Sequence, residues 1–459
     1  MLNKSVIEKL AEIAGRDNVL TDEESLKCYS YDATRYASIP DAVVKPRDTG
    51  EVAKVMALAW EEAVPVTPRG AGTGLSGGSV PVKAGIVLST ERMNSAPRVH
   101  KEDLYVEAEA GLVTGNLHSA VEARGLFYPP DPASQSACTV GGNIGECAGG
   151  LTGLKYGTTR NYVLGLELVT PEGKVLRTGA RTVKSVAGYD VTRLMVGSEG
   201  TLGVVTSAFL KVLPLPPARR VLSCSFPDLG KASEAVSEIV GQGLVPSILE
   251  IMDEKTVTAV SDHTGEKLGD GVMLLIEFDG TRPICEEDAS RAREIVEGKF
   301  GGKVIADVDG SRRETVWKAR RAVLPALTRL SPTVILEDVT VPRSRLPEMA
   351  AGIMKVAERY ALRIAIFGHA GDGNLHPTFL TDKSKHDELK RVNAGISEMM
   401  RACIDLGGTI SGEHGIGLDK MPFLKLEVGK AGYDIMKRLK ASIDHKGIMN
   451  PGKMFYDAS

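Results

Sequence analysis

In the first half of the chain, apolar positions occur in short runs separated by glycine-rich turns. The runs GIVLST, LYVEAEAG, VLGLELVTPEG and TLGVVTSAFLKVL lie between about Thr49 and Val212. Short apolar or alternating runs bounded by turn residues predict β-strands. The segment TGEVAKVMALAWEEA, which precedes VPVTPRG, predicts a helix followed by a strand and a turn. This mixture predicts an α+β domain.

A second pattern follows PLPPARR, Pro214 to Arg220, whose prolines predict a linker. The strand-like runs VLSCSF, PSILEIM and VMLLIEF alternate with the helical segments DLGKASEAVSEIVGQG and EEDASRAREIVEGKF. Such repeats predict a ferredoxin-like antiparallel sheet with its helices on one side. The tail carries GGTISGEHGIG, helices and NPGKMF. We therefore predict three parts, at residues 1–217, 218–405 and 406–459.

Composition narrows the class of protein. A chain of 459 residues is too long for one core, and 42% hydrophobic with 25% charged residues is typical of a globular protein. The 56 basic and 59 acidic residues give a net charge of −3 without a basic block, which argues against nucleic-acid binding. No apolar segment is long enough for a transmembrane helix. Six cysteines without CxxC spacing predict reduced thiols in a cytoplasmic protein and no iron–sulfur cluster.

Glycine is concentrated in three segments of the first half. The loop PRGAGTGLSGGSVP, Pro68 to Pro81, has five glycines within nine residues. We interpret these as backbone N–H groups turned toward an anion, since packing alone makes little sense of such density. The loop is neither a Rossmann nor a Walker motif, and a turn without a ligand is the alternative. Two further clusters, Pro129 to Gly157 and Gly197 to Thr206, favour one large ligand such as a dinucleotide.

Two of the eight histidines flank a short glycine-rich turn. His369 and His376 lie in GHAGDGNLHP, between runs that predict the two strands of a hairpin. A hairpin brings both imidazoles to one place, and SGEHGIGLDK adds Glu413 and His414. Two imidazoles and a carboxylate suit a divalent metal with open coordination positions. Hydrogen-bonded histidines without a metal are the alternative.

Together these segments resemble the FAD-binding domain of the vanillyl-alcohol oxidase and p-cresol methylhydroxylase (PCMH) superfamily. From about Tyr31 to Phe455, the chain is similar to the FAD-linked D-2-hydroxyacid dehydrogenase branch, because five motifs occur in the expected order. The resemblance implies an α+β protein with a two-subdomain PCMH-type FAD-binding domain. It also implies a ferredoxin-like antiparallel-sheet substrate (cap) domain and a C-terminal helical return to the flavin.

The resemblance also implies the cofactor and its contacts. Non-covalent FAD is expected, because the first loop has neither histidine nor cysteine. Glu199, Gly200 and Val204 are implied near the adenine and ribose, and Asn450 near the flavin. The other implied FAD contacts are Pro68, Arg69, Gly70, Ala71, Gly72, Thr73, Gly74, Ser76, Gly77, Pro130, Asp131, Ser134, Gly141, Gly142, Asn143 and Gly145.

For the metal, the resemblance implies His369, His376 and Glu413 as ligands of zinc, manganese or iron. His414 is implied as the base that takes the substrate's hydroxyl proton, and orienting Glu413 is its alternative role.

Two further residues are implied to bind the substrate. Arg320, three residues after Trp317, is expected to pair with the substrate carboxylate, although a solvated basic helix face is the alternative. Asn374 is a candidate hydrogen-bond donor to the substrate.

The implied reaction is oxidation of a small D-2-hydroxy acid to the 2-oxo acid, with hydride transfer from C2 to flavin N5. Leu336 stands where D-2-hydroxyglutarate dehydrogenases carry a lysine, which favours D-lactate or glycolate. Without an NAD fingerprint, we expect a separate acceptor: an electron-transfer flavoprotein, an iron–sulfur subunit or a quinone.

Three alternatives stay open. They are a D-2-hydroxyglutarate dehydrogenase, a non-redox flavoenzyme like alkyl-dihydroxyacetonephosphate synthase, and a flavin-binding subunit that only relays electrons. A homodimer, and a cytoplasmic protein held at the inner membrane by a partner, are both compatible with the sequence.

Overall fold

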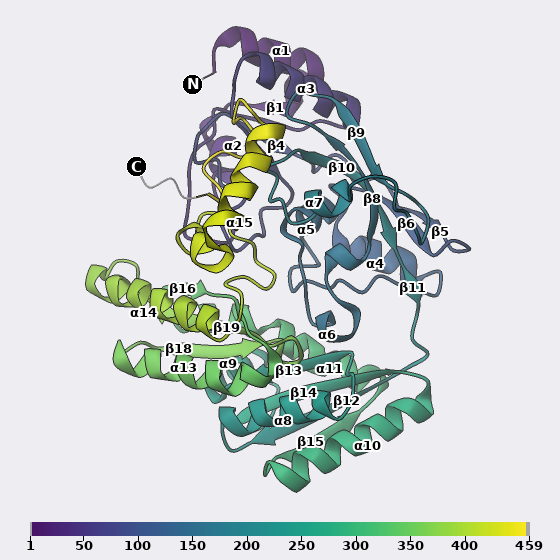
Figure 1. Ribbon diagram of the computed structural model, residues 1–459, viewed down its shortest axis with the longest axis vertical. Coiled ribbons are helices and arrows are strands. Elements are labelled where there is room, and N and C mark those ends of the chain that lie inside the picture. Colours follow the sequence, from purple (N-terminus) through teal and green to yellow (C-terminus); the bar gives the residue numbers. More distant parts are fainter. Residues whose placement is uncertain (1, 456–459) are drawn as a thin grey trace. The chain divides into compact units, whose positions relative to one another are not determined.

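Within the described residues, the apolar runs of the sequence form the strands of four sheets, many of which are labelled in Figure 1. The computed structural model describes residues 2–455. The chain forms two units: the first holds the N-terminal residues to Gly149, Thr158–Leu215 and the C-terminal part from Glu413, and the second holds Gly150–Gly157 and Pro216–Gly412. The chain therefore changes unit after residues 215 and 412, where we had predicted boundaries after 217 and 405, and residues 150–157 belong to the second unit.

The first unit contains a mixed four-stranded sheet in the order β1-β2-β4-β3. β2, β4 and β3 run parallel, and β1 pairs antiparallel with β2. The helices α1 and α3 contribute Leu10 and Met56 to a core that also contains Ile86 and Leu88 of β4. The elements are β1 (Val19–Leu20), β2 (Ala42–Val44), β3 (Val66–Arg69), β4 (Ile86–Ser89), α1 (Lys4–Ala14), α2 (Glu23–Cys28) and α3 (Thr49–Glu61).

An antiparallel five-stranded sheet follows in the same unit, in the order β5-β6-β10-β8-β9. Burial alternates along β10, as expected for a strand with one face on a core. The elements are β5 (Arg98–His100), β6 (Tyr105–Glu109), α4 (Thr114–Glu122), β7 (Leu126–Phe127), α5 (Val140–Glu146), β8 (Val163–Val169), β9 (Val175–Gly179), α7 (Val191–Met195), β10 (Val204–Lys211) and β11 (Leu213–Pro214).

The C-terminal segment returns to the first sheet after α15 (Met421–Ile443). Val66 of β3 donates its N–H to the Ile448 carbonyl at 2.8 Å, and Asn450 donates its N–H to the Val66 carbonyl at 2.7 Å. The buried carboxylate of Asp444 accepts the N–H groups of Ile448 and Met449. Residues 448–450 are therefore fixed along β3, from which the first glycine-rich loop departs.

The second unit is built on one antiparallel sheet in the order β15-β12-β14-β13-β18-β19-β16, with β17 paired to β19. This confirms the predicted antiparallel sheet. The strands are β12 (Ala218–Phe226), β13 (Ile248–Met252), β14 (Val272–Gly280), β15 (Lys303–Val308), β16 (Thr333–Leu336), β17 (Val339–Thr340), β18 (Ile364–Gly368) and β19 (Asn374–Thr381).

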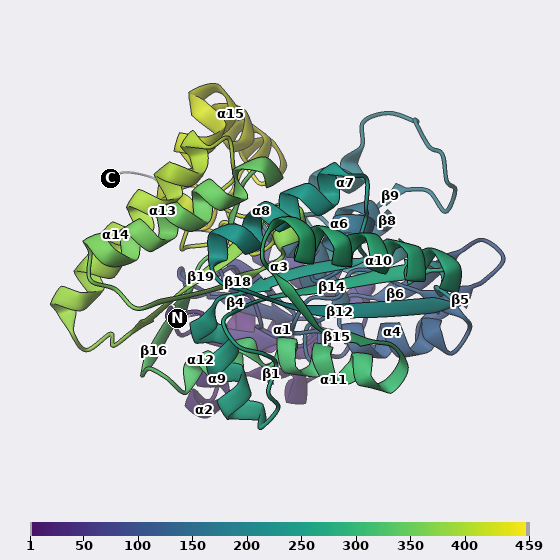
Figure 2. The ribbon, with the colours of Figure 1, turned by 90° about the horizontal axis from the view of Figure 1, so that it is seen from below.

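Helices cover both faces of this sheet, so the predicted one-sided arrangement is wrong. α8, α10, α13 and α14 lie on one side, and α9, α11 and α12 on the other (Figure 2). The physical reason is that β13, β18 and β19 are buried at every residue, which requires cover on both faces. The helices are α6 (Gly153–Tyr156), α8 (Leu229–Gly241), α9 (Glu254–Thr264), α10 (Arg282–Lys299), α11 (Gly310–Arg321), α12 (Val323–Thr328), α13 (Leu346–Arg359) and α14 (His386–Asp405).

The predicted linker is shorter than its proline-rich sequence indicated. Pro214 belongs to β11, which pairs with β7, and β12 already begins at Ala218. Arg219 and Arg220 pair with residues of β14 as part of the large sheet. Proline tolerates the end of a short edge strand, so it did not mark the end of regular structure here.

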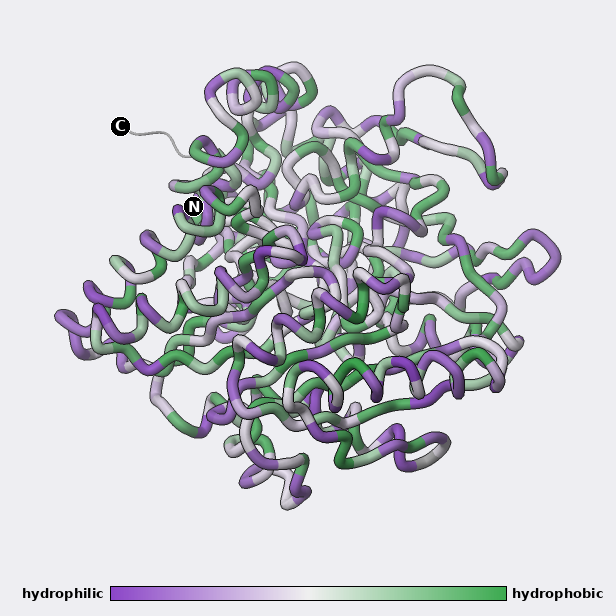
Figure 3. Tube along the Cα trace, turned by 60° about the horizontal axis from the view of Figure 1, so that its bottom comes forward, coloured by the Kyte–Doolittle hydropathy of each residue, from purple (hydrophilic) through white to green (hydrophobic). Residues whose placement is uncertain are grey.

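The hydropathy of the residues varies along the chain with the secondary structure. In Figure 3, hydrophobic and hydrophilic residues alternate along the outer helices. Among the described residues, no helix has both the length and the apolar character needed to cross a bilayer.

The core of the second unit gives a stability prediction. Phe379 is fully buried in β19, between Ile335 of β16 and Ile364 of β18. Phe379→Ala should lower the free energy of unfolding of this unit by about 3–5 kcal/mol, because it removes a large side chain from a packed site. Urea unfolding followed by Trp317 fluorescence, in a Trp60→Phe background, measures it. Ile284→Ala, on the exposed side of α10, is the control and should change stability by less than about 0.5 kcal/mol.

Candidate cofactor and active site

The first glycine-rich loop packs tightly against side chains of the second glycine-rich segment, in the same unit. A Cβ on Gly70 would lie 2.3 Å from Thr139 Oγ1, and a Cβ on Gly78 would lie 2.6 Å from Glu146 Oε1. Both are closer than a real Cβ contact. Packing against the second glycine cluster therefore explains part of the glycine density, which corrects our view that packing makes little sense of it.

Gly72 is required for a different reason. Its φ of +70° is unfavourable for other residues, and a Cβ there would lie 2.1 Å from the guanidinium of Arg69. Arg69 folds back over the loop and donates from Nη1 to the Tyr31 carbonyl at 2.7 Å. The Arg69 side chain thus stabilises the conformation of the loop.

Other positions of these loops fit a polar cofactor. A Cβ on Gly145 would meet no atom within 4 Å, and one on Gly74 would meet only Asp32 Oδ2, at 3.9 Å. The hydroxyl of Ser76 is buried without a hydrogen-bond partner in the described part of the chain. Buried polar groups rarely stay unpaired, so a ligand with phosphate or hydroxyl oxygens fits this loop.

Glu199 and Asn450 join the loops of the first unit to each other. The Glu199 carboxylate accepts the N–H groups of Ile416 and Gly417, both at 2.7 Å. Asn450 Nδ2 donates to the carbonyls of Glu199 and Gly78, at 2.7 and 2.8 Å. These side chains therefore have protein partners, and their contact with FAD stays a prediction.

Three other residues that were predicted to contact the cofactor differ in how their side chains and carbonyls are used within the protein. The side chain of Val204 is buried in the core beside the mixed sheet, which leaves its backbone as the group for the predicted cofactor contact. Asn143 is buried and donates from Nδ2 to Thr114 Oγ1 at 2.8 Å. The Pro130 carbonyl lies 2.9 Å from Nε2 of His118.

A buried charged cluster lies beside these loops. Lys453 donates to the Val80 carbonyl and, at 3.3 Å, to Asn450 Oδ1. Burial lowers the pKa of Lys453 to about 8, although nearby carboxylates including Asp32 oppose that shift. Burial likewise raises the pKa of Glu146. Sequence reasoning missed this cluster, although Glu146 lies within the second glycine-rich segment.

In the second unit, the predicted histidine hairpin is confirmed. β18 pairs antiparallel with β19, and Phe367 lies opposite His376. The rings of His369 and His376 meet edge to face, with centroids 5.1 Å apart. Both residues are buried, and one candidate ligand nitrogen of each lies within 4.8 Å of the other.

Sequence reasoning missed Glu250, which is completely buried on β13. Its Oε1 lies 2.5 Å from His369 Nδ1, and its Oε2 accepts from Arg320 Nε at 2.8 Å and from Nη2. Burial alone would raise the pKa of Glu250, but Arg320 and His369 outweigh it and hold the pKa below its usual value. The sequence did contain a signal for this residue, because an acidic residue inside the apolar run PSILEIM is unusual.

Arg320 lies on α11 and is buried, so a solvated basic face does not describe it. Glu250 occupies the Nε–Nη2 edge of its guanidinium, which also stacks over the Phe367 ring at 4.9 Å. A guanidinium has further N–H groups at Nη1 and Nη2. The predicted pairing of Arg320 with a substrate carboxylate stays a prediction.

Asp338 and Asn374 add polar groups beside the hairpin. Asp338 Oδ1 lies 4.0 Å from His376 Nδ1, and its Oδ2 accepts from Ser411 Oγ at 3.1 Å. Asn374 is buried, and its Oδ1 has no hydrogen-bond partner among the described residues. Two acidic residues inside the apolar run VILEDVTVP were the missed signal for Asp338.

Glu413 and His414 directly follow Gly412, the last residue of the second unit. A Cβ on Gly412 would lie 2.7 Å from Asn374 Nδ2, so the chain passes beside the hairpin before it reaches Glu413.

Comparison with known proteins agrees with the FAD and fold predictions. Residues 40–179 match the family model "FAD binding domain", and residues 215–454 match "FAD linked oxidases, C-terminal domain". Glycolate oxidase subunit GlcD of Bacillus subtilis (strain 168) is 44% identical, over 99% of this chain and 97% of that protein. D-lactate dehydrogenase of Anaerostipes hadrus is 35% identical, over 98% of this chain and 97% of that protein.

The structure of p-cresol methylhydroxylase with substrate bound has the same fold. Its TM-score is 0.78 at 17% identity, over 99% of this chain and 96% of that chain. The predicted PCMH-type α+β fold is thus confirmed. The chain belongs to the family of FAD-linked oxidases and is an oxidoreductase that uses FAD.

Proposed function

We propose that this protein oxidises a small D-2-hydroxy acid, D-lactate or glycolate, to the corresponding 2-oxo acid. The observation that carries the proposal is the pair His369 and His376, buried in one hairpin with Arg320 tied to the same cluster through Glu250. The names of the similar proteins, a glycolate oxidase subunit and a D-lactate dehydrogenase, support the same substrate class.

We infer that His369, His376 and Glu413 hold a divalent metal, which is zinc, manganese or iron. Two imidazoles and one carboxylate leave coordination positions for a substrate. Covalent connection supports the third ligand, because one peptide bond keeps the Cα of Glu413 about 3.8 Å from that of Gly412. Asp338, 4.0 Å from His376 Nδ1, adds a buried carboxylate beside that imidazole.

Arg320 and Asn374 suit the substrate carboxylate. The guanidinium keeps N–H groups beyond those used by Glu250, and arginine binds carboxylates through paired donors. Asn374 would donate from Nδ2 to the carboxylate, whereas its buried Oδ1, which lacks a protein partner within residues 2–455, can only accept a hydrogen bond, such as one from the substrate hydroxyl. Together they would hold the acid in one orientation.

When bound, FAD would supply the hydride acceptor, and the metal, held by His369, His376 and Glu413, would lower the pKa of the substrate hydroxyl. His414 takes the hydroxyl proton, so the substrate loses one proton and one hydride and becomes the 2-oxo acid. Its position next to Glu413 in the chain equally suits the orienting role.

Leu336 favours a small substrate. It ends β16 and packs, partly buried, on the core of the second unit. An apolar wall disfavours a second carboxylate by several kcal/mol. D-2-Hydroxyglutarate is therefore a weaker candidate than D-lactate or glycolate.

The electrons then pass to a separate acceptor: an electron-transfer flavoprotein, an iron–sulfur subunit or a quinone. The similar protein of Bacillus subtilis is named a subunit, which supports an acceptor within an assembly. Such an assembly would hold a cytoplasmic protein near the membrane.

Anaerobic flavin reduction tests the substrate class. D-Lactate or glycolate should bleach the flavin absorbance within the mixing time. L-Lactate and D-2-hydroxyglutarate should reduce the flavin at least about tenfold more slowly. The hydrogen-bond donors select one enantiomer of the substrate, and Leu336 disfavours a second negative charge. Prior incubation with a chelator should slow the bleaching. Retained bleaching after complete metal removal would contradict the metal inference, and no bleaching by any hydroxy acid would contradict the proposed function.

Two histidine variants separate base from ligand. His414→Ala should lower kcat by about 100-fold or more while metal content stays at the wild-type level, because it removes the proton acceptor. His376→Ala should lose the metal and keep the FAD. Metal analysis and flavin absorbance of both proteins check this. Loss of metal from His414→Ala would instead make His414 a ligand.

A further inference from the structure

Two neighbouring strands of the second unit each bury a glutamate on the same face of the sheet. Glu277 of β14 lies opposite Ile248 of β13, and Glu250 is two residues beyond Ile248. Opposed residues share a face, and positions two apart on a strand share it as well. Both carboxylates therefore point toward α11, and each needs compensation for its burial.

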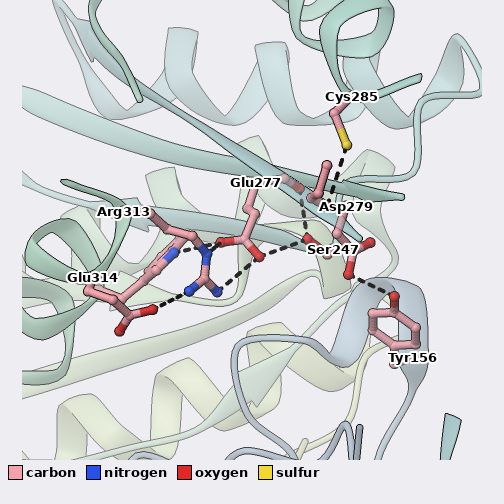
Figure 4. A network of polar contacts seen from close by, with 9 residues as sticks. Tyr156, Ser247, Glu277, Asp279, Cys285, Arg313 and Glu314 are labelled. Carbon is pink, nitrogen blue, oxygen red and sulfur yellow. Dashed lines mark hydrogen bonds and ion pairs between the residues drawn. The ribbon is translucent and has the colours of Figure 1, made fainter. Parts of the chain in front are cut away.

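Helix α11 supplies that compensation through three positions of one helical face. Arg313 Nε donates to Glu277 Oε2 at 2.6 Å, and Trp317 Nε1 donates to the same oxygen at 2.7 Å. Figure 4 shows Arg313 bridging Glu277 and Glu314. One turn further along, Arg320 donates to Glu250. The two glutamates are thus alike, because each is buried on a strand of the same sheet and each pairs with side chains of α11.

They differ in what else each carboxylate holds. The Glu277 carboxylate also accepts a hydrogen bond from the hydroxyl of Ser247, which donates to Oε1 at 3.2 Å. Glu250 instead gives Oε1 to Nδ1 of His369 at 2.5 Å. Because a carboxylate oxygen accepts, Nδ1 is the donor, and the nitrogen left to coordinate a cation is Nε2.

We propose that Glu250 is a positioning residue that fixes the orientation of His369 and anchors the guanidinium of Arg320 with the same carboxylate. This rests on the proposed metal centre. One side chain would then set both the affinity for the metal, through His369, and the affinity for the substrate carboxylate, through Arg320.

The glutamine variants of the two glutamates form a matched pair for the test. In Glu250→Gln, a single amide oxygen replaces two acceptors, so the amide NH2 group faces a donor of either His369 or Arg320. Competition of the metal-free holoflavoprotein with a chromophoric chelator for Zn²⁺ should show about 10–100-fold weaker binding in Glu250→Gln. Glu277→Gln should bind Zn²⁺ within about threefold of wild type, although both variants should unfold at lower urea concentration.

Kinetics give a second readout. Glu250→Gln should raise KM for D-lactate even at saturating metal, because Arg320 loses its anchor, whereas Glu277→Gln should leave KM unchanged. Wild-type Zn²⁺ affinity and KM in a folded Glu250→Gln would overturn the proposal, as would equal losses of Zn²⁺ affinity in both variants. If Glu250→Gln does not fold, Glu250→Asp, which keeps the charge and withdraws it by one methylene, takes its place with the same expected direction. Absence of Zn²⁺ binding by the wild type would instead refute the metal centre itself.

Discussion

Burial of charge in an apolar sheet is the constraint on which the polar architecture of the second unit depends. A carboxylate as deeply buried as that of Glu250 is destabilising unless partners satisfy both of its oxygens. Arg320 and His369 satisfy them, and in return the carboxylate limits where the guanidinium and the imidazole can lie. The same constraint fixes Arg313 and Trp317 around Glu277. Buried acids thus act as anchor points for the residues that face them.

Close approach of backbone segments is the matching constraint in the first unit. Segments that are far apart in sequence meet around the glycine-rich loop: Thr139 presses against Gly70, and Ser76 against Gly417. Asn450 then bridges the carbonyls of Gly78 and Glu199. Side chains at these glycines would push the segments apart. The loops that suit FAD are therefore held by each other, and several glycines serve this packing rather than the ligand directly.

Most of the local structure could be predicted from the sequence, because hydrophobic period and turn residues act over a few residues. The hairpin at His369 and His376 and the strands of the second unit are examples. The errors arose where context outweighed the local pattern. Pro214 lies in a short strand, and helices cover both faces of the large sheet because its central strands are buried on both.

The sequence by itself determined the family, the glycine-rich loops and the meeting of His369 with His376, since residues seven apart across a tight turn have few other arrangements. Only the tertiary structure decided their partners. Glu250 lies 119 positions from His369 and 70 from Arg320 along the chain. Their contact depends on the pairing of β13 with β18 and on the docking of α11, which follow from burial of the whole sheet. No local pattern encodes which buried cation a buried carboxylate will meet.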